Sequence, residues 1–117
     1  MNLFICYPRC TTCQKAQRWL DAHGVAYAFR DIKKEHPSET ELREWVQRSG
    51  LPLKRFFNTS GQTYRELGLS SKMAAMSEDE LFALLASDGM LVKRPVMITG
   101  DAVLVGFNEE AWAAALL

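Results

Sequence analysis

The succession of hydrophobic patterns near the amino terminus constrains the fold most. Leu3–Tyr7 is a short apolar run that suits a strand covered on both faces, and Pro8 ends it. From Thr11 the apolar residues follow helical spacing until Gly24, and Val25–Arg30 again has strand character. Two strands joined by one helix form a parallel, right-handed β-α-β unit, which predicts an α/β fold.

Helical patterns dominate residues 37–88. Ser38 with Glu41 three residues later forms a capping box, and Ser77 with Glu80 forms a second one. Apolar residues at helical spacing follow each of these starts. These residues are therefore predicted to form a block of helices.

Strand character returns toward the carboxyl terminus. Pro95–Ile98 and Ala102–Val105 are close enough to form an antiparallel hairpin, and Asn108 caps a last helix. The predicted order is β-α-β, then helices, then β-β-α, with a mixed sheet. Because the outer pieces are incomplete alone, we expect residues 1–117 to form a single domain with residues of about 37–88 as a helical insertion.

The charge balance argues against a broad electrostatic partner. The chain has 14 Lys and Arg against 14 Asp and Glu, so its formal net charge is zero. Binding to nucleic acid or to an anionic membrane needs a basic excess or stripe. The basic pairs are short and are expected to be solvated surface: Lys33-Lys34, Lys54-Arg55 and Lys93-Arg94. With no long apolar run and no basic leader, we expect a cytoplasmic protein without a membrane partner.

The three cysteines at positions 6, 10 and 13 are spaced C-x3-C-x2-C, which admits two kinds of metal site. Three thiolates can ligate an iron–sulfur cluster, but Cys6 falls in the apolar run, where a cysteine usually behaves as a small buried hydrophobe. A zinc site needs four ligands, and neither His23 nor His36 stands in a ligand pattern. We therefore expect no metal, and we expect Cys6 to be structural and to lie well away from the helix start.

Cys10 and Cys13 fit a redox pair better. Cys10 falls where the strand turns into the helix, and Cys13 follows one helical turn later, at a separation that suits a disulfide. A thiolate at a helix N-terminus is favoured by the unpaired amides and the helix dipole. Hydroxyl donors and cations flank the pair: Thr11, Thr12, Arg9 and Lys15. The alternative, two unreactive cysteines, remains open.

The stretch Lys93-Arg94-Pro95-Val96 precedes a predicted strand. In thioredoxin-like folds, a cis-proline at this place lies against the C-x-x-C motif. Arg94 would then reach the cysteines and hold a thiolate, an oxyanion or a carboxylate. The alternative is a trans proline that opens an edge strand.

Four segments resemble the arsenate reductase and Spx-like family over essentially the full chain. They are CTTCQKAQRWLDAHG, FFNTSGQTYRELGLS, DGMLVKRPV and VLVGFNEEAW. The resemblance implies a thioredoxin-like fold with a helical insertion. It also implies that Cys10 is the nucleophile and that Arg94 lies close to it.

The family that these segments resemble contains proteins with different functions. Glutaredoxin-linked arsenate reductases surround one cysteine with three arginines, of which only Arg94 is matched here, while Asn58 and Gly106 take the other two places. Spx-like regulators use C-x-x-C as a redox switch and bind the C-terminal domain of the RNA polymerase α-subunit. Gly50 matches a glycine on their polymerase-binding surface, although a glycine that ends a helix is also ordinary capping chemistry.

Three functions follow as expectations. The first is a thiol–disulfide oxidoreductase in which Cys10 attacks, Cys13 resolves and Arg94 stabilises the thiolate or substrate anion. Substrate-binding positions would be Thr11, Thr12, Asn58 and Pro95. No bound cofactor is expected, and thioredoxin, or glutathione with glutaredoxin, would supply electrons. The second is an Spx-like, redox-sensing transcriptional regulator without direct nucleic acid binding, and the third is an arsenate reductase.

Overall fold

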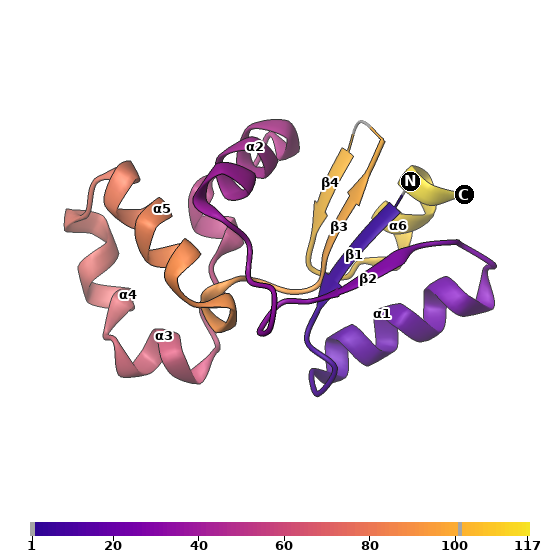
Figure 1. Cartoon of the computed structure of the whole chain (residues 1–117), viewed down its shortest axis with the longest axis horizontal. Coiled ribbons are helices and arrows are strands. Elements are labelled where there is room, and N and C mark those ends of the chain that lie inside the picture. Colours follow the sequence, from indigo (N-terminus) through magenta and orange to yellow (C-terminus); the bar gives the residue numbers. More distant parts are fainter. Residues whose placement is uncertain (1, 101) are drawn as a thin grey trace.

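A computed structural model describes residues 2–100 and 102–117, which form a four-stranded mixed sheet with helices on both faces (Figure 1). The strands are β1 (Asn2–Cys6), β2 (Ala28–Asp31), β3 (Val96–Thr99) and β4 (Ala102–Val105). Their order in the sheet is β2-β1-β3-β4. β1 and β2 are parallel, while β3 is antiparallel to both β1 and β4. The predicted β-α-β unit and the predicted hairpin are therefore confirmed.

The helices fall into two groups on either side of the sheet. On one side lie α1 (Thr11–Ala22) and α6 (Glu109–Leu116). The second group lies on the other side, and in the chain it comes between β2 and β3. It consists of α2 (Glu39–Ser49), α3 (Gln62–Glu66), α4 (Leu69–Lys72) and α5 (Glu78–Ser87). Three 3-10 turns accompany them: η1 (Leu53–Phe56), η2 (Met73–Ala75) and η3 (Gly89–Leu91). In the part of the chain that the structure describes, no helix is both long and apolar enough to cross a membrane.

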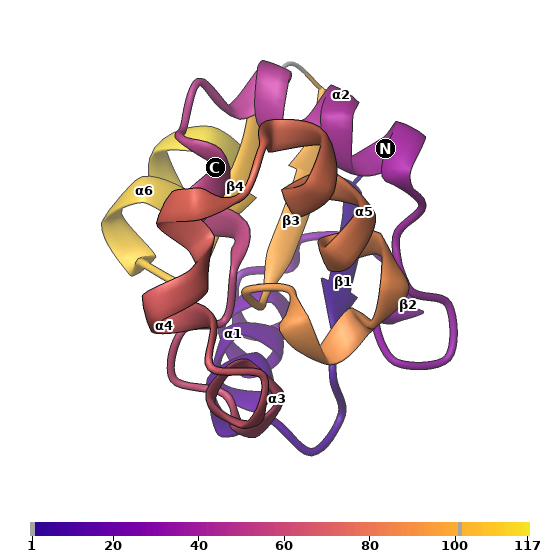
Figure 2. The same cartoon turned by 90° about the vertical axis from the view of Figure 1, so that its left-hand side faces the viewer.

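Two buried clusters hold these layers together. The larger one packs the inner faces of α2 and α5 against the sheet, and it includes Phe56 and Phe57. Figure 2 views this side of the molecule, with α5 in front of β3 and β1. The smaller cluster lies between the sheet and the pair α1 and α6, with Phe4, Leu20 and Trp112 at its centre. Apolar burial on both faces is the main stabilising contribution to such a sheet.

The local start and stop signals are the expected ones. Ser38 and Ser77 each accept a hydrogen bond from the backbone three residues on, within complete capping boxes at α2 and α5. The Asn108 side chain accepts from the Ala111 amide at the start of α6. Gly50 ends α2 in the left-handed region, with φ 70°. Side-chain oxygens at these caps pair amides that the helix leaves unpaired, which explains the fixed helix boundaries.

An ion pair fixes the start of α2 to the edge strand β2. Arg30 donates to both carboxylate oxygens of Glu41, at 2.7 and 2.9 Å, and Glu41 also accepts from the Ser38 amide. The hydrogen bonds from Arg30 lower the pKa of the Glu41 carboxyl from 4.5 to about 2. This carboxylate is thus held ionised, and the Arg30 contact joins the helical segment to the sheet.

The lowered pKa of Glu41 predicts an acid-sensitive contribution to stability. Above pH about 4.5 the contribution is fully present, and it is lost as the pH falls toward about 2. Because the pair is partly exposed, we expect Glu41→Gln to cost about 1 kcal/mol at pH 7 and little at pH 2. Urea unfolding at both pH values, followed by circular dichroism, measures the difference.

Glu80→Gln is the matched control, because Glu80 completes the other capping box and forms none of the recorded ion pairs among the described residues. We expect the contribution of Glu80 to depend less on pH than that of Glu41. An identical pH dependence in the wild type and in Glu41→Gln would show that the pair with Arg30 contributes nothing.

Candidate functional site

Cys10 lies at the junction between β1 and α1, as the residue that caps the helix. Its backbone is extended, its amide donates to the Tyr7 carbonyl at 3.0 Å, and its half-buried side chain makes no capping hydrogen bond. The first turn of α1, which the structure describes throughout, contains no acidic residue. Unpaired amides and the helix dipole favour negative charge there. Cys10 thus has the access and the local field that a nucleophilic thiolate needs.

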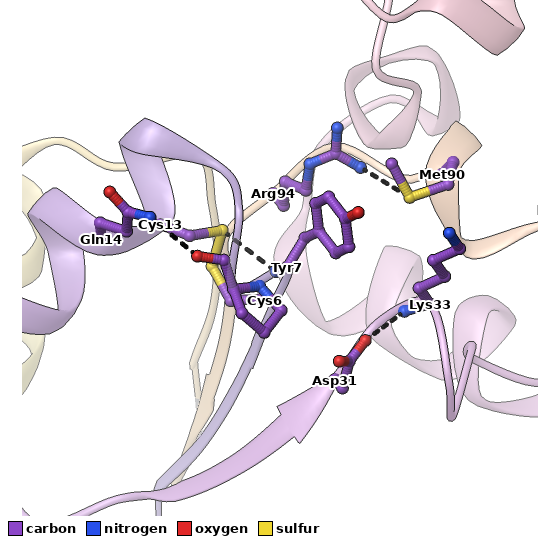
Figure 3. The surroundings of a disulfide bond; sticks show 9 residues. Cys6, Tyr7, Cys13, Gln14, Asp31, Lys33, Met90 and Arg94 are labelled. Carbon is purple, nitrogen blue, oxygen red and sulfur yellow. Dashed lines mark hydrogen bonds between the residues drawn. A yellow bond between two sulfur atoms is a disulfide. The ribbon is translucent and has the colours of Figure 1, made fainter.

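Cys13 is bonded to Cys6, not to Cys10 (Figure 3). The Cα atoms of Cys6 and Cys13 are 5.8 Å apart. Cys6 is fully buried and Cys13 is 3% exposed, and the Tyr7 amide donates to Cys13 Sγ at 3.3 Å. Two expectations are therefore wrong in this structure: that Cys10 pairs with Cys13, and that Cys6 lies well away from the helix start.

The alternation of side chains along β1 explains this pairing. Successive residues of a strand point to opposite faces, so Phe4 and Cys6 face the smaller cluster while Ile5 faces the larger one. Cys13 belongs to the buried stripe of α1, which packs on that same cluster. Cys10 caps the same helix with extended backbone and keeps its thiol free.

Arg94 precedes Pro95 at the start of β3, and the peptide bond between them is cis. The alternative of a trans proline is thus wrong. The guanidinium carbon of Arg94 lies 5.5 Å from the centre of the Tyr7 ring, and Nη1 is 3.7 Å from the sulfur of Met90. Figure 3 shows the guanidinium turned toward Met90, away from the disulfide. Its Nε is buried and has no hydrogen-bond partner among the described residues.

Two adjacent hollows share the cations Arg55 and Lys93, and Arg94 lines one of them. One, of about 320 Å³, is lined by Thr12, Arg55, Lys93, Arg94, Val105, Gly106, Phe107 and Asn108. The other, of about 340 Å³, is lined by Pro52, Lys54, Arg55, Phe57, Thr59 and Lys93. The described lining contains four cations and no carboxylate. We call the two hollows together the basic groove.

A short backbone bridge assembles the basic groove. Phe57 pairs with Val92, the Lys93 amide donates to the Phe56 carbonyl at 2.7 Å, and the Asn58 amide donates to the Leu91 carbonyl at 2.7 Å. The basic pairs Lys54-Arg55 and Lys93-Arg94 therefore lie side by side. The ion pairs recorded among residues 2–100 and 102–117 involve none of these four cations. Lys54 and Arg55 are exposed, as the expectation of solvated surface has it, while Lys93 and Arg94 are half-buried beside them.

The other predicted site positions are distributed around the groove. Thr12 lines it together with Arg94, Thr11 is exposed at the first position of α1, and Pro95 is buried. The Asn58 side chain does not line the groove and accepts from the Ser60 hydroxyl at 3.4 Å. Gly106 does line it, with φ 75°, a left-handed conformation that favours glycine.

No metal ligand set is present in the part of the chain that the structure describes. No three His, Cys, Asp or Glu side chains are grouped there so that they can share an ion. The chemistry that the arrangement offers is that of sulfur and of anion binding. The sequence pattern missed Cys6, Arg55 and Lys93, because their positions depend on contacts between distant segments.

Comparisons with known proteins place these features in a family. The model of the ArsC family matches residues 6–115. YusI of Bacillus subtilis (strain 168) is 52% identical over 114 residues, which cover 94% of this chain and 97% of YusI. The global transcriptional regulator Spx of Staphylococcus saprophyticus is 27% identical over 103 residues, which cover 88% of this chain and 77% of Spx.

A solved structure supports the same assignment. The crystal structure of an ArsC-family-related protein from Bacteroides fragilis is 51% identical, with a TM-score of 0.95, and covers 97% of this chain and 96% of that chain. This match confirms the predicted thioredoxin-like fold. The family model and the relative YusI each match most of the chain. We conclude that this protein belongs to the ArsC family.

Proposed function

We propose that the protein is a thiol–disulfide oxidoreductase in which Cys10 attacks disulfides or oxidised thiols that carry negative charge. The observation that carries the proposal is the placement of Cys10, a half-buried free thiol at an acid-free helix start. The basic groove begins two residues away, at Thr12. The groove offers the positive charge, and Cys10 offers the nucleophile.

The reaction follows from the chemistry of thiolates. The Cys10 thiolate attacks one substrate sulfur, which forms a mixed disulfide and releases the other sulfur as a thiolate. The Cys13 thiolate then attacks Cys10 Sγ and releases the reduced substrate. The Tyr7 amide, 3.3 Å from Cys13 Sγ, stabilises negative charge on that atom. Thioredoxin, or glutathione with glutaredoxin, returns two electrons to the protein, and no resident cofactor takes part.

Arg94 and its neighbours are the substrate-binding cations in this proposal. The unpaired Nε of Arg94 is a buried donor without an acceptor, a state that is costly unless a ligand or water satisfies it. Arg94 lines the groove, where its guanidinium would bind a carboxylate or other oxyanion of the substrate. Arg55 and Lys93 add charge beside Gly106, one of the two further positions at which the resemblance to arsenate reductases places an arginine.

Replacing the nucleophile tests the proposal directly. We expect Cys10→Ser to lose about 100-fold or more of the exchange activity, because a hydroxyl is not ionised at neutral pH. Reduction of bis(2-hydroxyethyl) disulfide, coupled to a thioredoxin system, measures the activity. Unfolding curves establish that the variant is folded. Unchanged turnover in a folded Cys10→Ser protein would refute the function.

Charge-neutral variants of the groove test the substrate class. We expect Arg55→Gln and Lys93→Gln each to raise KM for oxidised glutathione about three- to fivefold, as exposed cations contribute roughly 1 kcal/mol or less. KM for the uncharged bis(2-hydroxyethyl) disulfide stays constant. Arg65→Gln and Lys72→Gln, at cations outside the groove, are the controls. Equal effects on both substrates would mean that the groove does not select anions.

A second candidate function is a redox-regulated binding protein, which the relationship to the regulator Spx favours. Its partner would be the C-terminal domain of the RNA polymerase α-subunit. Gly50, the position implied by the Spx-like resemblance, is exposed at the end of α2, and a Cβ there would meet no atom within 4 Å. The position is thus open to a partner surface.

Binding to the purified polymerase domain tests this candidate. We expect the affinity to differ between the reduced and oxidised protein, and Gly50→Arg to weaken it about tenfold by steric conflict. Gly24→Arg is the matched control, since Gly24 has the same left-handed backbone and equally open surroundings at the end of α1. Biolayer interferometry measures the dissociation constant for the reduced and for the oxidised protein. Absence of binding in either redox state removes this function.

A further inference from the structure

The three cysteines differ in how far their side chains are exposed to solvent. Cys10 is half-buried, Cys13 is 3% exposed, and Cys6 is fully buried at the end of β1. The disulfide joins the two inner cysteines (Figure 3). Cys10 packs against the cluster that contains both of them. This arrangement is different from an exposed pair in which both sulfurs face the substrate.

Burial restricts how electrons reach the inner disulfide. Thiol–disulfide exchange requires a thiolate to approach one sulfur of the bond along a clear path. Neither Cys6 nor Cys13 offers such a path to a thiol in solution, because both are almost completely covered. Cys10, three residues from Cys13, is the free thiol that packs against the same cluster and is partly exposed to solvent.

We propose that Cys6 is a second resolving cysteine, so that oxidation received at Cys10 passes through Cys13 and ends as the Cys6–Cys13 disulfide. The inference rests on the proposed function of Cys10. It extends the reacting set from the pair Cys10 and Cys13 to three sulfurs. Cys10 is returned to the thiolate state while the protein is oxidised, and it is then the entry point for the reductant.

Each step conserves atoms and electrons. Cys10 thiolate attacks the substrate disulfide, and one substrate thiolate leaves. Cys13 thiolate attacks Cys10 Sγ, forms the Cys10–Cys13 bond and releases the second substrate thiolate. Cys6 thiolate attacks Cys13 Sγ, forms the Cys6–Cys13 bond and releases Cys10 thiolate. In sum, two cysteine thiols become one disulfide, one substrate disulfide becomes two thiols, and two protons pass from the protein to the products.

The surroundings of the sulfurs favour this end state over a Cys10–Cys13 bond. Cys6 is packed with the apolar side chains of Phe4, Met97 and Trp112. A Cys6–Cys13 bond leaves the free sulfur at the helix start, where it is partly exposed, and a Cys10–Cys13 bond leaves it fully buried in the apolar cluster.

Mapping the bonds over time in the wild-type chain tests the order of steps. The reduced protein is mixed with equimolar bis(2-hydroxyethyl) disulfide, quenched with N-ethylmaleimide at intervals and digested for mass spectrometry. We expect Cys10–Cys13 to form first and to decline as Cys6–Cys13 accumulates, with Cys10 alkylated in the end state. A final Cys10–Cys13 bond with Cys6 unpaired would overturn the proposal.

Access to the inner disulfide gives an independent test. Oxidised wild type and oxidised Cys10→Ser are reduced with dithiothreitol under native conditions, and we expect the variant to react at least about tenfold more slowly. In denaturing guanidinium chloride the two proteins should react at equal rates, which controls for intrinsic reactivity. Equal rates under native conditions would show that the disulfide is reached directly and would overturn the relay.

These outcomes separate the relay from the proposed function. If Cys10→Ser is inactive but the wild type ends as Cys10–Cys13, the oxidoreductase stands and the relay fails. If a folded Cys10→Ser protein retains turnover, the oxidoreductase itself fails. The variant Cys6→Ala gives a third test. The relay predicts that oxidation of this variant stops at the Cys10–Cys13 disulfide. If the Cys10 thiol were regenerated in the variant as fast as in the wild type, the relay would be contradicted.

Discussion

The burial of β1 on both faces is the constraint on which the site depends. Phe4 and Cys6 pack into the smaller cluster, and Ile5 packs into the larger one, so β1 is fixed from both sides. Its register with β3 pairs Ile5 with Val96. The residues that follow β1 and those that precede β3 therefore lie at the same edge of the sheet. That edge brings the start of α1 close to the Arg94–Pro95 segment (Figures 1 and 3).

Local sequence signals were sufficient for most of the architecture. The capping boxes at Ser38 and Ser77 and the cap at Asn108 involve residues only three apart, so each can be recognised without tertiary information. The parallel pairing of β1 and β2 follows from the connection by one helix. The short helices α3 and α4 fall within the predicted helical block, but the sequence does not give their bounds, because their starts carry no side-chain cap and packing of Tyr64 and Leu69 stabilises them instead.

The candidate site was less predictable, because its decisive contacts join distant segments. To predict the Cys6–Cys13 bond, one must know on which face of β1 the Cys6 side chain lies. A continuous apolar run does not show this, because both of its faces are apolar. Arg55 and Lys93 meet only through the bridge between Phe57 and Val92, 35 positions apart. A net charge of zero concealed this local concentration of cations, since composition averages over the whole surface.

The packing of β1 does not by itself require sulfur at position 6. A fully buried strand position between Phe4 and the face of α1 is filled equally well by valine or alanine with small adjustments. A disulfide between residues only seven apart in sequence closes a short loop, where the entropic contribution is at the lower end of the usual range, about 2–3 kcal/mol. What cysteine adds at this position is a covalent bond to Cys13. In the relay that we propose, this bond gives Cys6 a chemical role beside its packing, because it makes the sulfur of a core residue part of the reacting set that begins at Cys10.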